Sequence, residues 1–270
     1  MPPINIVYRE QAFIVIDKYI QPGFSIVIMI DDIILIEGKM MIYVMSDIHG
    51  HYDQFMEMLK IINFKNEDEL YVLGDCIDKG PKSIDTLLYC LEHYNIHMCL
   101  GNHEFMMYQY LRSAKQGNWY EKKEFQNLWF GYNFGRKTYD QYMKLMPYKR
   151  EQIYRSLYSM PLCFPDIRIE DKSFYLVHSC PIKTDTQSIP SVNNCSDDEI
   201  ESSVWSRYVI PVNGKTVIHG HTICYDEVIH FNHNEINIDC GAAANLSLGC
   251  LCLNDMSEYY IRLSDSRNFC

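Results

Sequence analysis

Positively charged residues are scarce in this chain. Its 270 residues include 24 Lys and Arg against 35 Asp and Glu, which gives a formal net charge of −11 at neutral pH. A protein that binds duplex nucleic acid through the phosphate backbone usually presents a broad basic face. We therefore expect no duplex nucleic acid as a partner. If the substrate is anionic, the positive charge that receives it has to be local, from a few basic side chains or from bound metal ions.

Long hydrophobic runs and paired cysteines are also lacking. The most apolar early stretch, residues 24–36, contains Asp31 and Asp32 and is too short to cross a bilayer. The first residues do not form the basic segment, apolar run and cleavage site of a secretory signal. The eleven cysteines include no Cys-x-x-Cys pair, which argues against a zinc knuckle or a disulfide framework. We expect reduced thiols in a cytoplasmic protein without a membrane partner.

The length, with 47% hydrophobic and 22% charged residues, is typical of one large folded domain. Residues 1–40 differ from the rest, because they are rich in Ile and Val and carry none of the motifs described below. They form an N-terminal extension of unknown role: either the natural start is Met40 or Met41, or the segment adds a hairpin or an edge strand. We assign residues 41–270 to the main domain.

Short apolar runs that alternate with amphipathic segments predict an α/β fold. The first half of the domain reads as a β-α-β-α-β series, which builds a parallel sheet with crossover helices. Its strands are predicted at 41–46, 68–73 and 96–100, and its helices at 55–62 and 84–91. Residues 103–160 lose strand character and predict a helical insertion. Later strands are predicted at 163–169, 173–177, 216–219, 227–230, 236–239, 248–253 and 259–263, with a hairpin turn at 232–234.

Side chains that can bind metal follow five of the predicted strands. Because ligands bind at the carboxyl ends of strands in open α/β sheets, we expect these five segments to converge. Carboxylate, imidazole and amide oxygen suit Mn²⁺, Fe²⁺ or Zn²⁺ better than Ca²⁺. The five segments are Asp47-Ile48-His49, Gly74-Asp75-Cys76-Ile77-Asp78, Gly101-Asn102-His103-Glu104, His178 and His219-Gly220-His221-Thr222.

In this order the motifs DxH, GDxxDKG, GNHE, a strand-borne His and GHT resemble those of the calcineurin-like metallophosphoesterases. Within that family, the pattern is similar to the PPP-type serine/threonine phosphoprotein phosphatases in their compact bacterial and phage form. The resemblance covers about residues 41–263. It implies an α/β fold of two sheets in a β-sandwich, flanked by helices and carrying the helical insertion. Ile223, where larger relatives often have a further His, favours the PPP-type branch.

The resemblance also implies a centre of two divalent metal ions, with Mn²⁺ as the first choice and Fe²⁺ or Zn²⁺ as alternatives. Two such ions share one hydroxide, which attacks phosphorus directly. One ion would be held by Asp47, His49 and Asp75, and the other by Asp75, Asn102, His178 and His221. Asp75 would bridge the two ions.

The remaining roles implied by the resemblance concern the substrate. His103 would be the general acid for the leaving group, and Asp78 would orient it. Asn102 and Arg207 would contact the phosphate. Lys79 stands where the family has Arg, and an ammonium group lacks the planar fork that binds two phosphate oxygens at once.

These features predict a metal-dependent phosphatase that acts on phosphomonoesters, with phosphoserine or phosphothreonine in proteins as the first candidate. The second candidate is a hydrolase of dinucleoside polyphosphates such as diadenosine tetraphosphate, which shares the same motifs. The third is a phosphate-binding module without catalytic activity.

Glu104 is expected to be structural. The aromatic stretch 119–148 is expected to form either a substrate lid or helix packing. The histidines outside the motifs are expected on the surface: His51, His93, His97, His230 and His233.

Overall fold

The computed structural model of the chain describes residues 39–182 and 188–263. The predicted N-terminal extension lies, apart from its last two residues, outside the described residues, so the boundary at residue 41 stays a prediction. Among the helices of the described residues, none has both the length and the apolar character needed to cross a membrane.

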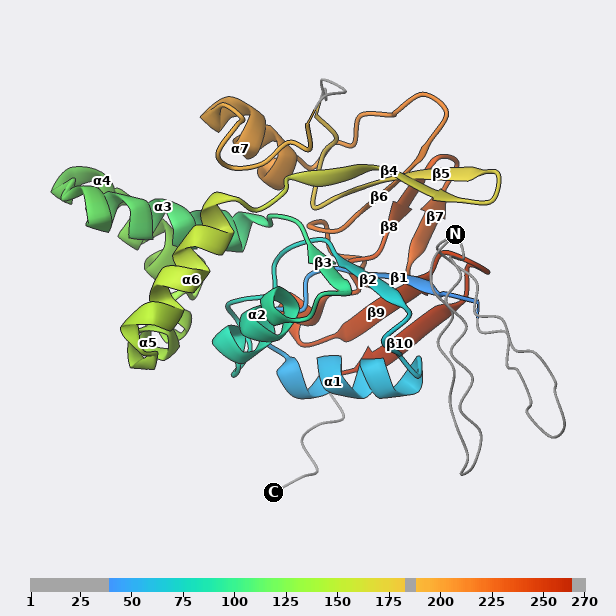
Figure 1. Cartoon of the computed structure of the whole chain (residues 1–270), viewed down its shortest axis with the longest axis horizontal. Helices are drawn as coiled ribbons and strands as arrows, with labels where there is room; N and C mark the ends of the chain where they lie inside the picture. Colours follow the sequence, from blue (N-terminus) through green and yellow to red (C-terminus); the bar gives the residue numbers. More distant parts are fainter. Residues whose placement is uncertain (1–38, 183–187, 264–270) are drawn as a thin grey trace, which may run out of the picture. The chain divides into compact units, whose positions relative to one another are not determined.

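The first of two five-stranded sheets has the strand order β10-β9-β1-β2-β3 (Figure 1). β1, β2 and β3 are parallel, and helices α1 and α2 connect them on one side of the sheet, as the sequence predicts. All four residues of β1 are buried, and β9 and β2 pair with its two edges. The bounds are β1 Ile42–Met45, α1 Tyr52–Ile61, β2 Glu69–Val72, α2 Ser83–Glu92, β3 Ile96–Met98, β9 Ser247–Cys252 and β10 Glu258–Arg262.

The second sheet has the order β4-β5-β6-β8-β7 and forms the other layer of the sandwich (Figure 1). β5, β6 and β8 are parallel, so the second sheet also brings parallel strand ends to one edge. The expected α/β fold of two sheets flanked by helices is confirmed. The bounds are β4 Cys163–Ile169, β5 Lys172–Val177, α7 Asp197–Trp205, β6 Thr216–His219, β7 His230–Asn232 and β8 Glu235–Asn237.

One predicted strand is wrong. Residues 227–230 were expected to be a strand, but β7 begins only at His230. Glu227 has a φ of +66°, a left-handed conformation that an extended strand does not accommodate. The turn predicted at 232–234 is confirmed, because β7 ends at Asn232 and pairs with β8 through a hairpin.

The helical insertion follows β3 directly and extends away from the sandwich (Figure 1). Its first helix starts at Asn102, so the insertion carries two predicted site residues in its first turn. Gly117, with a φ of +71°, ends that helix in the left-handed conformation that favours glycine. Outside the insertion, a short 3-10 helix, η2 (Ala242–Ala244), precedes β9. The insertion comprises α3 Asn102–Gln116, α4 Trp119–Gln126, the π-helix η1 Asn127–Tyr132, α5 Arg136–Lys144 and α6 Pro147–Tyr158.

Candidate active site

The five motif segments converge at the carboxyl ends of β1, β2, β3, β5 and β6, as the sequence predicts. Backbone bonds join the first two loops, since the amides of Asp47 and His49 donate to Gly74 O and Asp75 O at 3.1 and 2.8 Å. His178 Nδ1 lies 2.7 Å from Leu73 O and so links the two sheets. All six predicted metal ligands come together there: Asp47, His49, Asp75, Asn102, His178 and His221.

Two motif glycines are required by the close approach of these loops. A Cβ on Gly101 would lie 2.2 Å from Asp75 Oδ1, and a Cβ on Gly220 would lie 2.1 Å from Asp47 Oδ2. Neither position has room for a side chain. The glycines of GNHE and GHT therefore allow the backbone to touch the carboxylates that the site is built around.

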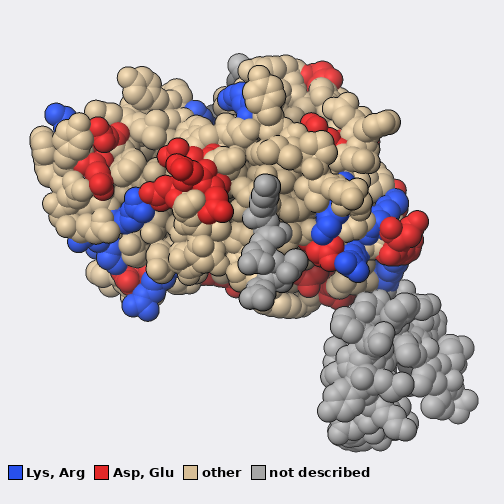
Figure 2. Space-filling model, turned by 90° about the horizontal axis from the view of Figure 1, so that it is seen from above, with Lys and Arg blue, Asp and Glu red and all other residues tan. Residues whose placement is uncertain are grey.

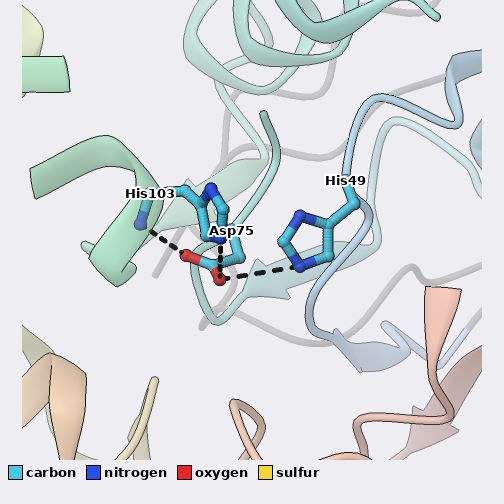
Figure 3. Close-up of side chains that lie close together, drawn as sticks. All are labelled: His49, Asp75 and His103. Carbon is cyan, nitrogen blue, oxygen red and sulfur yellow. Dashed lines mark hydrogen bonds and ion pairs between the residues drawn. The ribbon is translucent and has the colours of Figure 1, made fainter. Parts of the chain in front are cut away.

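A first cluster consists of His49, Asp75 and His103 (Figure 3). Asp75 Oδ2 lies 3.6 Å from His49 Nε2 and 3.9 Å from His103 Nε2. The backbone amide of His103 donates to Asp75 Oδ1 at 3.0 Å, which fixes the carboxylate at the start of α3. Asp47 Oδ1 lies 3.8 Å from His49 Nε2, so the three predicted ligands of the first ion lie together.

A second cluster consists of Asp75, His178 and His221. Asp75 Oδ1 lies 3.7 Å from His178 Nε2, so one carboxylate belongs to both clusters. Asn102 Oδ1 lies 3.0 Å from His178 Nε2 and 3.0 Å from His221 Nδ1. Asp75 is thus the residue that the two clusters have in common.

Backbone strain is concentrated at the site. Thirteen described residues other than glycine have a positive φ, and six of them are predicted site residues. Such conformations cost about 1–3 kcal/mol each and persist where the surrounding structure imposes them. The backbone therefore turns sharply after β1, β2 and β6, where these residues lie. The six residues are Asp47, His49, Asp75, Asp78, Lys79 and His221.

The histidines present unprotonated nitrogens to the two clusters. His49 Nδ1 lies 3.0 Å from Ile77 O and His178 Nδ1 lies 2.7 Å from Leu73 O, and a carbonyl oxygen only accepts. Both Nδ1 atoms therefore carry the proton, which leaves the Nε2 lone pairs free. Burial holds the pKa of His49 and of His178 well below the usual range, and it lowers the pKa of His221 to about 4. The neutral imidazole is the form of histidine that binds a metal ion.

The donor set fits divalent cations. His178 Nε2 and Asn102 Oδ1 are both acceptors, yet they face each other at 3.0 Å, an arrangement that a cation between them would stabilise. Burial and the charges of nearby carboxylates raise the pKa of Asp47 and of Asp75 well above the usual range. Two buried carboxylates side by side need a compensating positive charge. The six predicted residues therefore suit two divalent ions, whose identity stays a prediction.

Glu104 holds the loop that carries Asp75, in the structural role expected from the sequence. Its Oε2 accepts from the amides of Asp75 at 2.7 Å and Gly101 at 3.2 Å, and its Oε1 accepts from Cys76 at 2.8 Å. The side chain is fully buried, and burial raises its pKa to about 7.

His103 is bonded to Asp78, the residue predicted to orient it. Their Nδ1 and Oδ2 atoms are 2.6 Å apart. Burial lowers the pKa of His103 to about 3 and raises that of Asp78 to about 7. With Asp78 ionised, the short hydrogen bond places the ring proton of His103 on Nδ1, and a general acid requires a second proton on Nε2. Nε2 faces the cluster around Asp75.

Two further partners of Asp78 come from the helical insertion. The sequence analysis did not identify them. Trp129 Nε1 donates to Asp78 Oδ2 at 2.8 Å, and Thr138 Oγ1 donates to Asp78 Oδ1 at 2.5 Å. The pairs are 51 and 60 residues apart in the chain, and no local motif signals such contacts. Part of the aromatic stretch is thus helix packing that reaches the site.

The two predicted phosphate-binding cations lie at the edge of the site. Lys79 is half-buried, and its Nζ lies 4.3 Å from the centre of the Phe134 ring. Its charge lowers the pKa of His103, which places the ammonium group near the first cluster. Arg207 is exposed in the segment after α7, and its charge lowers the pKa of His221 and of Asp239.

The expectation that His51 lies on the surface is wrong. The ring is buried, and its Nε2 lies 3.1 Å from Ala242 O. It joins the loop after β1 to η2. Asp239, which the sequence analysis did not single out, is also buried, and its charge contributes to the raised pKa of Asp47.

Comparison with known proteins agrees with this geometry. A model of the calcineurin-like phosphoesterase family matches residues 40–225. The chain belongs to this family. Calcineurin-like phosphoesterases are hydrolases, and the expectation of an enzyme is confirmed. The family also implies divalent metal ions, in keeping with the donor set.

The curated relatives of this calcineurin-like phosphoesterase are similar to it over a short part of its sequence. A symmetrical bis(5'-nucleosyl)-tetraphosphatase of Neisseria gonorrhoeae is 37% identical over 67 residues, 24% of each chain. One from Wigglesworthia glossinidia brevipalpis is 39% identical over 80 residues, 27% of this chain and 29% of that protein. The matches thus span about a quarter of the relatives' length.

Among solved structures, a candidate diadenosine tetraphosphatase has a TM-score of 0.52 and 18% sequence identity. The structural match covers 82% of this chain and 92% of the diadenosine tetraphosphatase chain. At this identity the likeness concerns the fold alone. The names of these relatives do not specify the PPP-type subgroup.

Proposed function

We propose that this phosphoesterase hydrolyses symmetrical dinucleoside tetraphosphates, such as diadenosine tetraphosphate, to two nucleoside diphosphates. The observation that carries the proposal is the similarity, at 37–39% identity, to curated symmetrical tetraphosphatases from several bacteria. This reverses the order of the two substrate hypotheses drawn from the sequence. The relatives' names support the dinucleotide better than a phosphoprotein.

Two side chains beside the site suit a nucleotide substrate. Phe134 is 63% exposed although it is aromatic, and it has a φ of +64°, a strained conformation for a bulky residue. Lys79 lies over its ring. An exposed aromatic face stacks on a nucleobase, and a neighbouring ammonium binds a phosphate group. Together they offer a base and its phosphate chain a place next to the metal ligands.

The catalytic roles follow from the geometry of this chain's own residues. When bound, divalent ions would neutralise phosphate charge and supply a nucleophile from water. Asp47, His49 and Asp75 would hold one ion, and Asp75, Asn102, His178 and His221 the other.

The other residues act on the substrate. His103, held by Asp78, donates the Nε2 proton to the leaving phosphate oxygen. Lys79 and Arg207 bind the flanking phosphates, and Asn102 assists the positioning of the group that reacts.

The charge distribution agrees with a small anionic substrate. On the face that Figure 2 shows, the Lys and Arg side chains of the described residues lie in several small groups interspersed with Asp and Glu. Several basic side chains of the described residues are paired, for example Lys115 with Glu151 at 2.6 Å and Lys215 with Asp166 at 2.8 Å. The expectation of no duplex nucleic acid as partner stays a prediction.

The products of the Mn²⁺-loaded protein test the proposal. We expect diadenosine tetraphosphate to give ADP alone, with a kcat/KM at least tenfold above that for a phosphoserine peptide. AMP with ATP would mean asymmetrical cleavage, and a peptide turned over faster than the dinucleotide would restore the phosphoprotein hypothesis. If neither substrate nor p-nitrophenyl phosphate is turned over, the result would support the third hypothesis, a phosphate-binding module without catalytic activity.

Replacing Phe134 should affect the dinucleotide selectively. Base stacking on an aromatic side chain is worth about 1–3 kcal/mol, so Phe134→Ala should raise the KM for diadenosine tetraphosphate roughly 5- to 150-fold. The KM for p-nitrophenyl phosphate should change little, because that substrate has no base. Phe134→Tyr, which keeps the ring, is the matched control. Equal changes for both substrates would exclude a base platform at this position.

Lys79 is the departure from the family pattern, and its charge is what we expect to matter. A charged hydrogen bond is worth about 1.5–3 kcal/mol, so Lys79→Ala should lower kcat/KM about 10- to 100-fold. Lys79→Arg should cost little and should tighten phosphate binding, because the guanidinium keeps the charge and adds a planar fork. Steady-state kinetics of the three proteins decide this. An unaffected Ala variant would remove Lys79 from the site.

A further inference from the structure

Asp78 is held from three directions. The carboxylate is almost completely buried, with 1% of the residue exposed. Its Oδ2 accepts from His103 Nδ1 at 2.6 Å and from Trp129 Nε1 at 2.8 Å, while its Oδ1 accepts from Thr138 Oγ1 at 2.5 Å. The Asp78 amide also donates to Ser83 Oγ at 2.9 Å. With these contacts, the carboxylate plane has one orientation.

Trp129 is itself fixed by its surroundings. It lies in the π-helix η1, is fully buried, and contacts the rings of Tyr110 and Tyr139 with centroid distances of 5.8 and 6.4 Å. A Cβ on Gly135 would lie 2.1 Å from its Nε1. The backbone of Gly135 therefore packs directly against the indole at the nitrogen that donates to Asp78. A π-helix inserts an extra residue per turn and is frequently found at functional sites.

We propose that Trp129 and Thr138 are positioning residues for the hydrolysis, because they fix Asp78 and, through it, the direction of the His103 ring. A carboxylate bonded to His103 alone would rotate with the ring. Held by two donors from the insertion, it keeps Nε2 aimed at the leaving group. The helical insertion therefore contributes to the rate of bond cleavage by orienting Asp78 and His103. The inference rests on the role proposed for His103.

The test uses two substrates that differ in their leaving group. Trp129→Phe and Thr138→Val each remove one hydrogen-bond donor and keep most of the side-chain shape. With the Mn²⁺-loaded variants, we expect kcat for phenyl phosphate to fall roughly 10- to 100-fold, by analogy with residues that support metal ligands. The fall for p-nitrophenyl phosphate should be several-fold smaller, since p-nitrophenolate leaves without much help from an acid. KM should stay within about twofold.

The ratio of the two kcat values is the decisive readout. It does not depend on the fraction of folded enzyme, so a loss of stability in either variant leaves it unchanged. Tyr139→Phe is the matched control, because it removes a hydroxyl from the same aromatic cluster without touching Asp78. We expect its ratio to equal that of the unmodified protein. In an Asp78→Asn background, Trp129→Phe should lower kcat by less than about twofold.

Two outcomes would overturn the inference. One is an equal loss of kcat on both phosphate esters in Trp129→Phe and Thr138→Val. The other is an undiminished effect of Trp129→Phe when Asp78 is already Asn. If His103→Gln shows the leaving-group dependence and these variants do not, the inference alone fails. If His103→Gln shows none either, the role proposed for His103 fails with it.

Discussion

Asp75→Asn should abolish the response of the enzyme to Mn²⁺ and lower kcat/KM by more than about 100-fold. The Asp75 carboxylate lies within 3.6 and 3.7 Å of a ring nitrogen in each of the two clusters, so this single change alters both proposed ion sites. Changes that affect only the support of a metal ligand already cost about 10- to 100-fold. Activity titrations with Mn²⁺ and elemental analysis of the purified proteins measure the effect.

The stability of the same proteins gives an independent readout. Mn²⁺ at about 100 times its Kd should stabilise the unmodified protein by about 2.7 kcal/mol, seen as a higher Tm. Asp75→Asn should show little of this shift. Without metal, the variant should be no less stable than the unmodified protein, because burial and the neighbouring carboxylates already disfavour the charge of Asp75.

Asp140→Asn is the matched control, since Asp140 is an exposed carboxylate that pairs with Arg136 far along the insertion. Its metal content, kcat/KM and Tm shift should equal those of the unmodified protein. Full activity of the unmodified protein in a chelated sample, with the absence of metal verified by elemental analysis, would contradict a metal-dependent mechanism. A Tm shift of normal size in Asp75→Asn would contradict the place given to that carboxylate.

The sequence predicted the elements that carry the metal ligands because the signals for them are local. An apolar run followed by Gly-Asp or Gly-Asn marks the end of a buried strand, and β2 and β3, which these pairs follow, end within one or two residues of their predicted ends. Gly101 and Gly220 confirm what such glycines indicate, a backbone pressed against carboxylates. The convergence of five loops then followed from a general property of parallel strands.

The contacts that the sequence did not predict depend on tertiary packing. Trp129 and Thr138 reach Asp78 because η1 and α5 of the insertion pack against the loop after β2. His51 is buried because η2, which lies 191 residues further along, packs against its loop. Glu227 sits in an apolar segment that suits a strand, but its φ of +66° ends the extended backbone. No pattern in a single sequence reports contacts over such separations.

His103→Gln should retain both metal ions while kcat falls by roughly 10²- to 10⁴-fold. The amide of Gln can still accept or donate a hydrogen bond, but it cannot transfer a proton to the leaving oxygen. The loss should therefore be smaller for p-nitrophenyl phosphate than for phenyl phosphate. Steady-state kinetics on both esters, with elemental analysis of each protein, measure the two effects separately.

The same variant separates the two chemical roles that the geometry allows His103. Its Nε2 lies 3.9 Å from Asp75 Oδ2 and belongs to a cluster able to hold an ion, yet its Nδ1 is committed to Asp78. If His103 were a ligand, His103→Gln would lose metal, and added Mn²⁺ at high concentration would restore activity. If His103 is the general acid, metal content stays the same and added Mn²⁺ restores nothing. His97→Gln is the control, because His97 pairs with Glu69 at the β2–β3 edge and should change neither quantity.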